Sequence, residues 1–127
     1  MAVGMIQPHT TGLIQGHQAD SQNEVNVARA LDLAGLQYWY HYNIGDISVR
    51  GGVEVDFLVY NGTLTIPVQV GTGGYFHSGR QAAEDLVKNL KIEEYGRSHG
   101  WDEMKEFTLE DSNTLEAARA WVKKEIL

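Results

Sequence analysis

The sequence predicts a single α/β domain with the element order helix, three strands, helix, strand, helix. The chain of 127 residues has the length of one domain and can bury a core. Its apolar fraction of 43% and charged fraction of 21% are ordinary for a globular protein. Helical and strand-like periodicities alternate along the chain without an internal repeat or a low-complexity tract.

The first helix is predicted over residues 22–34, because the sequence carries both a start signal and an end signal for it. Ser21 and Glu24 have the spacing of a capping box, and Gly35 is typical of a left-handed C-cap. Residues 1–20 show little periodicity, so we expect a flexible N-terminal arm there and the folded domain over the remainder of the chain.

Three strands are predicted next, over residues 38–44, 53–60 and 64–70. The dipeptide Asn61–Gly62 favours a tight turn and makes the last two strands a hairpin. Pro67 lies inside the third run. It indicates an edge position or a bulge, because proline cannot donate a ladder hydrogen bond.

The glycine-rich residues 71–74 interrupt the strand pattern, and a helical pattern follows over residues 78–95 with an end at Gly96. A fourth strand is predicted over residues 104–109. A last helix then begins at Asn113, with Glu116 three positions later. Its apolar stripe consists of Leu115, Ala118, Val122 and Ile126.

Composition narrows the classes of function. The formal net charge of −7 is unfavourable for a simple nucleic-acid binder, since phosphate contacts need Lys and Arg. The absence of cysteine excludes disulfides and thiolate metal sites and fits a reducing interior. No apolar run approaches the ~18 residues that span a bilayer, and the start lacks the pattern of a secretory signal. We therefore expect a cytoplasmic protein with no membrane contact.

Three short stretches, in the expected order, resemble the PD-(D/E)XK nuclease superfamily. Residues 51–57 (Gly-Gly-Val-Glu-Val-Asp-Phe) resemble the strand that carries the family's metal-binding aspartate, and residues 66–70 resemble the neighbouring strand with its second ligand. Residues 75–77 (Tyr-Phe-His) resemble a stretch of the very-short-patch repair endonucleases. The resemblance covers about residues 21–127. It implies a restriction-endonuclease-like αβββαβα core, with a mixed four-stranded sheet flanked by helices.

One branch resembles the chain more closely than the parent family does, namely the EDxHD nucleases of phage-associated homing endonucleases. Its signature is matched here by Glu24, Asp56, Gln69, His77 and Asp85. The D/E-x-K triplet of the parent family would fall at residues 69–71, which read Gln-Val-Gly. Both the carboxylate and the lysine are therefore missing. This departure leaves two alternatives, the histidine-containing variant or an inactive relative.

Asp56 is the best candidate ligand for a divalent cation. Phosphodiester cleavage needs a hard ion such as Mg²⁺ (or Mn²⁺), which prefers oxygen ligands. An aspartate in an apolar strand is costly to bury unless it is paired or metal-bound, although a surface salt bridge would also explain it. The resemblance implies Glu24 and Gln69 as further ligands. The alternatives are the capping box for Glu24 and an outer strand position for Gln69.

His77 is the candidate general base, because a neutral imidazole can accept a proton from the attacking water. Asp85 lies eight positions later, roughly on the same helix face, and can orient the imidazole; a loop histidine beside a solvated helix is the alternative. Arg80 and Lys88 are candidate phosphate ligands on that helix. Both could equally be surface cations. The aromatic residues 38–42 could stack on bases, but alternation places about half of them in the core.

Three functional interpretations remain open. The first is a Mg²⁺-dependent DNA endonuclease of the homing or repair type. The second is a catalytically degenerate nuclease-fold protein with a structural or DNA-positioning role in a larger, phage-related assembly. The third is a catalytic domain that depends on a separate DNA-targeting partner. The partners that these interpretations imply are DNA and either a second copy of the chain or a targeting protein.

Overall fold

The computed structural model describes residues 13–45, 53–71 and 79–127. In chain order, the elements are β1 Leu13–Ile14, β2 His17–Gln18, α1 Gln22–Leu33, β3 Gln37–Ile44, β4 Val53–Asn61, β5 Leu64–Val70, α2 Gly79–His99, β6 Lys105–Phe107, the 3₁₀ helix η2 Glu110–Ser112, and α3 Leu115–Glu125. From α1 onward the α-helices and strands follow the predicted order, whereas β1, β2 and η2 were not predicted.

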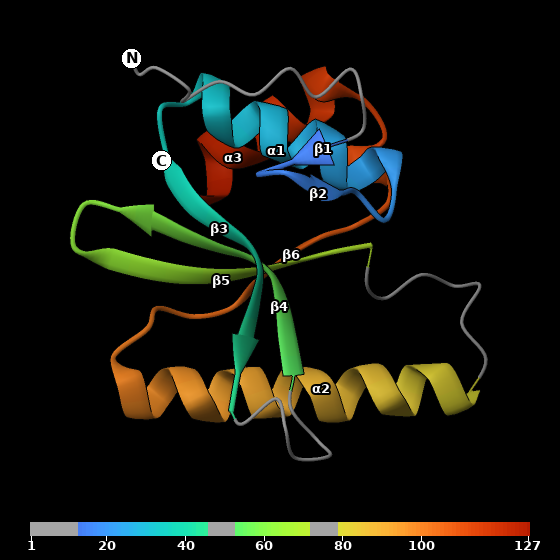
Figure 1. Ribbon diagram of the computed structural model, residues 1–127, viewed down its shortest axis with the longest axis vertical. Coiled ribbons are helices and arrows are strands. Elements are labelled where there is room, and N and C mark those ends of the chain that lie inside the picture. The colour runs from blue at the N-terminus through green and yellow to red at the C-terminus, as the bar shows by residue number, and fades with distance from the viewer. Residues whose placement is uncertain (1–12, 46–52, 72–78) are drawn as a thin grey trace.

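The main sheet has four strands in the order β3-β4-β5-β6. The β3–β4 and β4–β5 pairs are antiparallel, and the β5–β6 pair is parallel, so the sheet is mixed. Helices α1 and α3 lie together at one end of the molecule, and α2 crosses the other end (Figure 1). The protein is therefore an α/β domain with a mixed four-stranded sheet and helices on both sides of it.

Buried apolar side chains form two clusters. In β3, Tyr40 belongs to the cluster that packs against α1 and α3, whereas Ile44 belongs to the cluster that includes Ile92 of α2. In β4, Phe57 joins the first cluster and Val55 joins the second. The change from one cluster to the other thus falls at the middle of the β3–β4 ribbon.

The β3–β4 ladder is interrupted at that same place. Residues on both sides of His41 and Asp56 are paired, and their register would place these two residues opposite each other. His41 and Asp56 themselves are not paired. His41 has a φ of 56°, a left-handed value that is strained for a residue with a side chain. The sheet therefore opens at the boundary between the two apolar clusters.

The hairpin of β1 and β2 corrects the expectation of a loose arm for residues 13–18. Ile14 is fully buried in the core. The side chain of Gln15 donates to the carbonyl of Tyr38 at 2.6 Å and accepts from the N–H of Tyr40 at 2.9 Å. Because β3 is an edge strand, these bonds satisfy backbone groups that would otherwise be open to another chain. Residues 1–12 lie outside the described part of the chain.

The long helix α2 extends past the predicted end at Gly96 to His99. Gly100, with a φ of 74°, is the residue that follows the helix in the left-handed conformation. A Cβ on Gly96 would lie 3.2 Å from the Cβ of Trp101, so this glycine permits close packing of the helix against the indole. The predicted helix end at Gly96 was wrong, because the sequence alone does not distinguish a glycine that ends a helix from one that allows close packing of another side chain.

Two smaller expectations also change. The last helix is capped by Thr114, whose hydroxyl accepts from the N–H of Ala117 at 3.0 Å, and not by Asn113. Pro67 lies in β5, which is an interior strand, but β6 pairs only from Val68 onward. Pro67 therefore lies at a position of β5 that does not pair with β6. Its lack of an N–H thus removes no hydrogen bond from the β5–β6 ladder.

Candidate functional site

The described part of the predicted site lies at the opening of the sheet. Glu24 comes from the first turn of α1, Asp56 from β4 and Gln69 from β5. Lys88 belongs to α2 and is close enough to influence the ionisation of Asp56. His77 lies outside the described residues, as does the side chain of Arg80. Three elements distant in sequence thus bring three of the expected side chains toward one place.

Asp56 and Gln69 face each other just beyond the last regular pair of the β4–β5 ladder. That ladder ends at Phe57 and Val68. The N–H of Asp56 donates to Gln69 Oε1 at 2.8 Å, and the N–H of Val70 donates to Asp56 Oδ2 at 2.9 Å. Side chains therefore replace the missing backbone bonds, and these two residues become fixed relative to each other.

The carboxyl of Asp56 is half-buried, and its charged form is disfavoured there. Burial raises its pKa, and this effect exceeds the opposite influence of the Val70 N–H, Lys88 and His41. Removing a carboxylate from water is unfavourable unless positive charge compensates it. The free protein thus holds Asp56 in an environment that a bound cation would relieve, and Lys88 supplies only part of that compensation.

Glu24 is buried, with 5% of its surface exposed. The helix cap is made by Ser21, whose hydroxyl accepts the Glu24 N–H at 3.2 Å. The Glu24 carboxylate accepts bonds from the hydroxyl of Tyr40 and, at 3.3 Å, from the N–H of Asp20. Its side chain is thus turned toward the sheet. The capping motif predicted from sequence and the inward carboxylate are both present.

Burial also raises the pKa of Glu24, and the hydrogen bond from Tyr40 lowers it to a smaller extent. The negative charge of Asp56 contributes a further increase. Two desolvated carboxylates therefore repel each other across the opening of the sheet. Such a pair binds a proton or a cation more readily than isolated carboxylates on the surface do.

Gln69 is completely buried. Its Oε1 is used by the Asp56 N–H, which fixes the orientation of the amide. Its Nε2 has no hydrogen-bond partner among the described residues. A buried amide with an unpaired donor is costly, so the open N–H groups favour an acceptor such as water or a phosphate oxygen.

His41 is the residue of the site that sequence reasoning missed. Its Nε2 lies 3.3 Å from Asp20 Oδ2 and 3.8 Å from Glu24 Oε1, and its Nδ1 lies 3.3 Å from Glu54 Oε1. Asp20, Glu24 and His41 form a group of side chains that could hold a metal ion. In sequence, His41 appears only as one member of an aromatic strand, and its strained backbone conformation leaves no local signal.

The face of α2 that turns toward the sheet changes character along the helix. Asp85, Lys88 and Asn89 occupy half-buried positions near its start, and Ile92 is fully buried one turn later. The spacing of these residues places them on one stripe. Asn89 Oδ1 is buried without a hydrogen-bond partner in the described structure. Along this stripe, residues 85, 88 and 89 thus present polar groups, and Ile92 anchors the helix through apolar contact.

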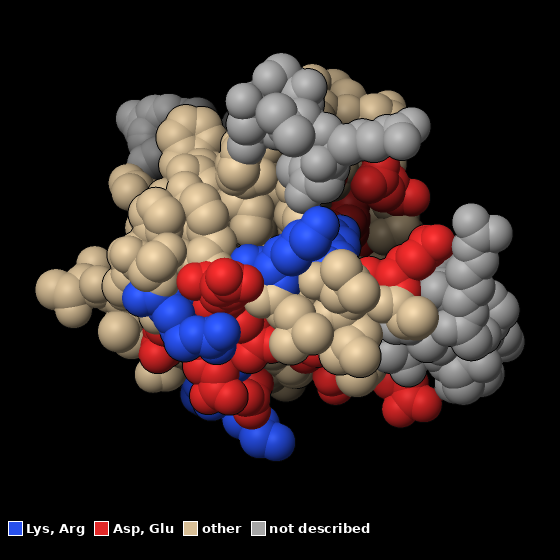
Figure 2. All heavy atoms as spheres, turned by 90° about the horizontal axis from the view of Figure 1, so that it is seen from below, with Lys and Arg blue, Asp and Glu red and all other residues tan. Residues whose placement is uncertain are grey.

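The molecular surface offers no broad positive region on the face that carries α2. Figure 2 shows acidic side chains spread over this face among a few basic ones, with no continuous basic patch among the described residues. This distribution agrees with the net charge of −7. Electrostatic attraction of a nucleic acid to this face would therefore be weak.

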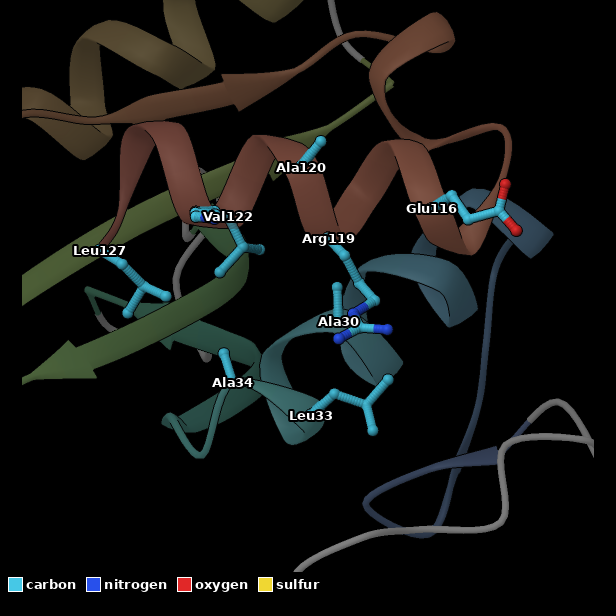
Figure 3. Close-up of a pocket in the computed structure, with 9 residues that line it drawn as sticks. Ala30, Leu33, Ala34, Glu116, Arg119, Ala120, Val122 and Leu127 are labelled. Atoms are coloured by element: carbon cyan, nitrogen blue, oxygen red, sulfur yellow. The ribbon is translucent and has the colours of Figure 1, made fainter.

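A groove of about 500 Å³ lies away from the carboxylates, between α1 and α3. Figure 3 shows that small and apolar side chains from both helices line it, including Ala30, Leu33 and Val122, and that Arg119 extends from α3 toward Ala30. None of the residues that line it belongs to the polar group described above. This groove is therefore separate from the candidate functional site.

Comparison with protein-family models, curated proteins and solved structures found no match for this chain. Among the described helices, none combines the length and the apolar character needed to cross a membrane. The site is consequently interpreted from its own geometry and from the sequence resemblance alone.

Proposed function

We propose that this protein is a divalent-cation-dependent DNA endonuclease of the PD-(D/E)XK kind, with Asp56 at the centre of its active site. The observation that carries the proposal is the convergence of Glu24, Asp56 and Gln69 at one opening of the sheet. The sequence resemblance implies the same three positions as cation ligands. Lys88, which the sequence offered as a phosphate ligand, acts electrostatically on the central carboxylate.

The donor set suits Mg²⁺ or Mn²⁺. Both ions favour carboxylate and water oxygens, and Asp56 and Glu24 offer two desolvated carboxylates whose pKa values are raised by burial. Asp56 Oδ2 is held by the Val70 N–H, so the orientation of this ligand is fixed before an ion arrives. A bound cation would supply charge compensation for the phosphate and a more acidic water.

The remaining side chains would bind and orient the substrate. The open Nε2 of Gln69 would donate to a phosphate oxygen or to the attacking water. Lys88 would offset negative charge on the phosphate and so take over part of the role of the absent D/E-x-K lysine. The lysine of that triplet would fall at Gly71, whose φ of 75° is strained for a residue with a side chain, so a cation from another element is the accessible alternative.

The sequence resemblance assigns water activation to His77, support of that imidazole to Asp85, and phosphate binding to Arg80. These roles stay predictions. Asp85 lies half-buried on the same stripe of α2 as Lys88. A side chain at this position can therefore act on the same side of the sheet as Asp56 does.

The test compares cleavage of plasmid and branched DNA in Mg²⁺ or Mn²⁺ by the native chain, Asp56→Asn and His77→Ala. A lost cation site should lower the rate about 100-fold, which corresponds to about 3 kcal/mol of transition-state stabilisation. Asp102→Asn is the matched control, because it removes the same charge from an exposed position. Equal rates in all four proteins would mean that the cleavage comes from elsewhere.

A second candidate function is a nuclease-fold protein that has lost catalysis and positions DNA in a larger assembly. Gln at position 69, Gly at position 71 and the net charge of −7 favour it. The two candidates differ in cation binding. Calorimetry that detects no Mn²⁺ site dependent on Asp56 would favour the non-catalytic role.

The scarcity of basic side chains suggests how an active enzyme would meet its substrate. With 10 Lys and Arg against 17 Asp and Glu, unaided cleavage should be weak and should fall steeply between low and physiological salt. A second copy of the chain or a DNA-targeting protein would then deliver the substrate. Flat activity over this salt range would argue against such a partner.

A further inference from the structure

We propose that Asp20, Glu24 and His41 form a binding site for one divalent transition-metal ion, of the class of Zn²⁺, Co²⁺ or Mn²⁺. The site is centred on His41 and not on Asp56. It shares Glu24 with the cation of the proposed nuclease but does not depend on nuclease activity, since the ligand set exists whether or not the chain cuts DNA.

The distances between the ligand atoms suit one ion. The three candidate ligand atoms all lie within 4.8 Å of one another. His41 Nε2 is 3.3 Å from Asp20 Oδ2 and 3.8 Å from Glu24 Oε1. Two ligands that each lie about 2.0–2.2 Å from a tetrahedral or octahedral ion are about 3–3.6 Å apart. The two distances from His41 Nε2 are close to this range.

The imidazole is oriented for metal binding by a carboxylate behind it. Glu54 Oε1 lies 3.3 Å from His41 Nδ1, on the opposite side of the ring from Asp20 and Glu24. A tautomer with its N–H on Nδ1, toward Glu54, carries the lone pair on Nε2, which is the ring nitrogen that lies near Asp20 and Glu24. Metal-binding histidines commonly donate their second ring nitrogen to such a carboxylate.

The nitrogen that would bind the ion, His41 Nε2, is buried and makes no hydrogen bond of regular geometry within the described residues, although Asp20 Oδ2 lies 3.3 Å away. A metal ion between these atoms would satisfy the buried nitrogen directly. The imidazole ligand also determines which metals fit. Nitrogen ligands favour Zn²⁺, Co²⁺ and related ions, whereas Mg²⁺ prefers an all-oxygen environment.

The surrounding structure holds the ligands in place before an ion binds. The N–H of Asp20 is 3.3 Å from Glu24 Oε1 and 3.3 Å from the Tyr40 hydroxyl, which fixes the backbone that carries the Asp20 carboxylate. The ring of Tyr40 stacks on that of His41, with 3.7 Å between their centroids. The positive end of the α1 dipole opposes a cation, but this effect is only about 0.3–1 kcal/mol near the surface.

One other state has the same geometry, namely a protonated His41 that forms ion pairs with the three carboxylates around it. In that state Nε2 carries a proton and cannot bind a metal. The two states are distinguished by metal binding itself, so the experiment measures the metal alone, without DNA.

Binding of Co²⁺ and Zn²⁺ to the full chain would be measured by calorimetry and by the visible absorption of Co²⁺. We expect one ion per chain, which an excess of Mg²⁺ does not displace. His41→Gln and Asp20→Asn should weaken binding more than about tenfold, and Glu54→Gln about tenfold, since loss of an outer partner costs 10–100-fold. Asp102→Asn is the control and should change the affinity by less than about threefold, because it removes the same charge from an exposed position that is not one of the three ligands.

A measurement on the native chain guards against variants that do not fold. In the presence of excess Mg²⁺, substoichiometric Zn²⁺ should shift the NMR signals of the His41 ring before those of His99, which lies at the far end of α2. Absence of transition-metal binding, unaltered binding in folded His41→Gln, or unaltered His41 signals would each overturn the proposal. Zn²⁺ binding without DNA cleavage would refute only the nuclease, and cleavage without His41-dependent binding would refute only this site.

Discussion

Asp56 and Gln69 fasten β4 to β5 through a reciprocal pair of hydrogen bonds. Gln69 Oε1 accepts from the backbone of Asp56, and Asp56 Oδ2 accepts from the residue after Gln69. The backbone ladder between the strands has already ended one residue earlier. The sheet can therefore open around a carboxylate without leaving these backbone groups unpaired.

Replacement of Gln69 by alanine should lower the free energy of unfolding by about 2–4 kcal/mol. It removes a completely buried side chain, creates a cavity and leaves the Asp56 N–H without its acceptor. Urea denaturation followed by circular dichroism measures the change. Gln37→Ala, at an exposed strand position, is the control and should stay within about 0.5 kcal/mol. A loss in Gln69→Ala no larger than in the control would contradict the role of this bond.

Asp56→Asn should stabilise the cation-free protein at neutral pH, with a rise in Tm of about 3 °C. The folded pKa of Asp56 is raised, so its folded state binds the proton more tightly than the unfolded state does. The stabilisation from that proton is complete below the ordinary pKa of 3.8 and is lost as pH rises through the folded pKa. Thermal unfolding at a series of pH values measures the difference.

The advantage of Asp56→Asn should vanish toward the acid end of that series, where the native carboxyl is protonated as well. Mg²⁺ should raise the Tm of the native chain and not that of the variant. Asp102→Asn separates the local effect from the change in net charge. An Asp56→Asn protein that is less stable than the native chain at pH 7 and more stable at pH 4 would contradict the raised pKa of Asp56.

Lys88→Gln should raise the pKa of Asp56, because the ammonium group of Lys88 is one of the influences that lower it. NMR titration of the Asp56 side chain measures this shift. If the proposed nuclease is correct, the same change should slow cleavage about 100-fold, as loss of one charge-stabilising group does. Lys124→Gln removes an exposed lysine in the last turn of α3 and serves as the control. An unchanged Asp56 pKa would remove Lys88 from the site.

Gly96→Ala should destabilise the protein by about 1 kcal/mol, although alanine is the better helix former. The new Cβ would lie 3.2 Å from Trp101 Cβ and 3.3 Å from its Cε3. Urea denaturation of Gly96→Ala, Trp101→Gly and the double variant tests the cause, because glycine at position 101 removes both the Cβ and the ring. In the Trp101→Gly background the change at Gly96 should become stabilising. A destabilisation that persists there would indicate a backbone effect instead.

The sequence determined the order of the elements and most of their bounds. The strand Leu64–Val70 was predicted to the residue, and the start of α1 followed from the capping spacing of Ser21 and Glu24. These features depend on contacts between neighbours in the chain, which composition and periodicity record. The same local reasoning selected Asp56, because a carboxylate in an apolar strand is unusual wherever the strand packs.

Which side chains come into contact depends on the tertiary structure. His41 joins Asp20 and Glu24 because β3 crosses the first turn of α1 and its ladder to β4 opens there. The influence of Lys88 on Asp56 depends on how α2 packs against β4, and the role of Gly96 depends on Trp101. These relationships join residues far apart in the chain. Their energies arise from long-range packing and desolvation, which no local pattern of residues encodes.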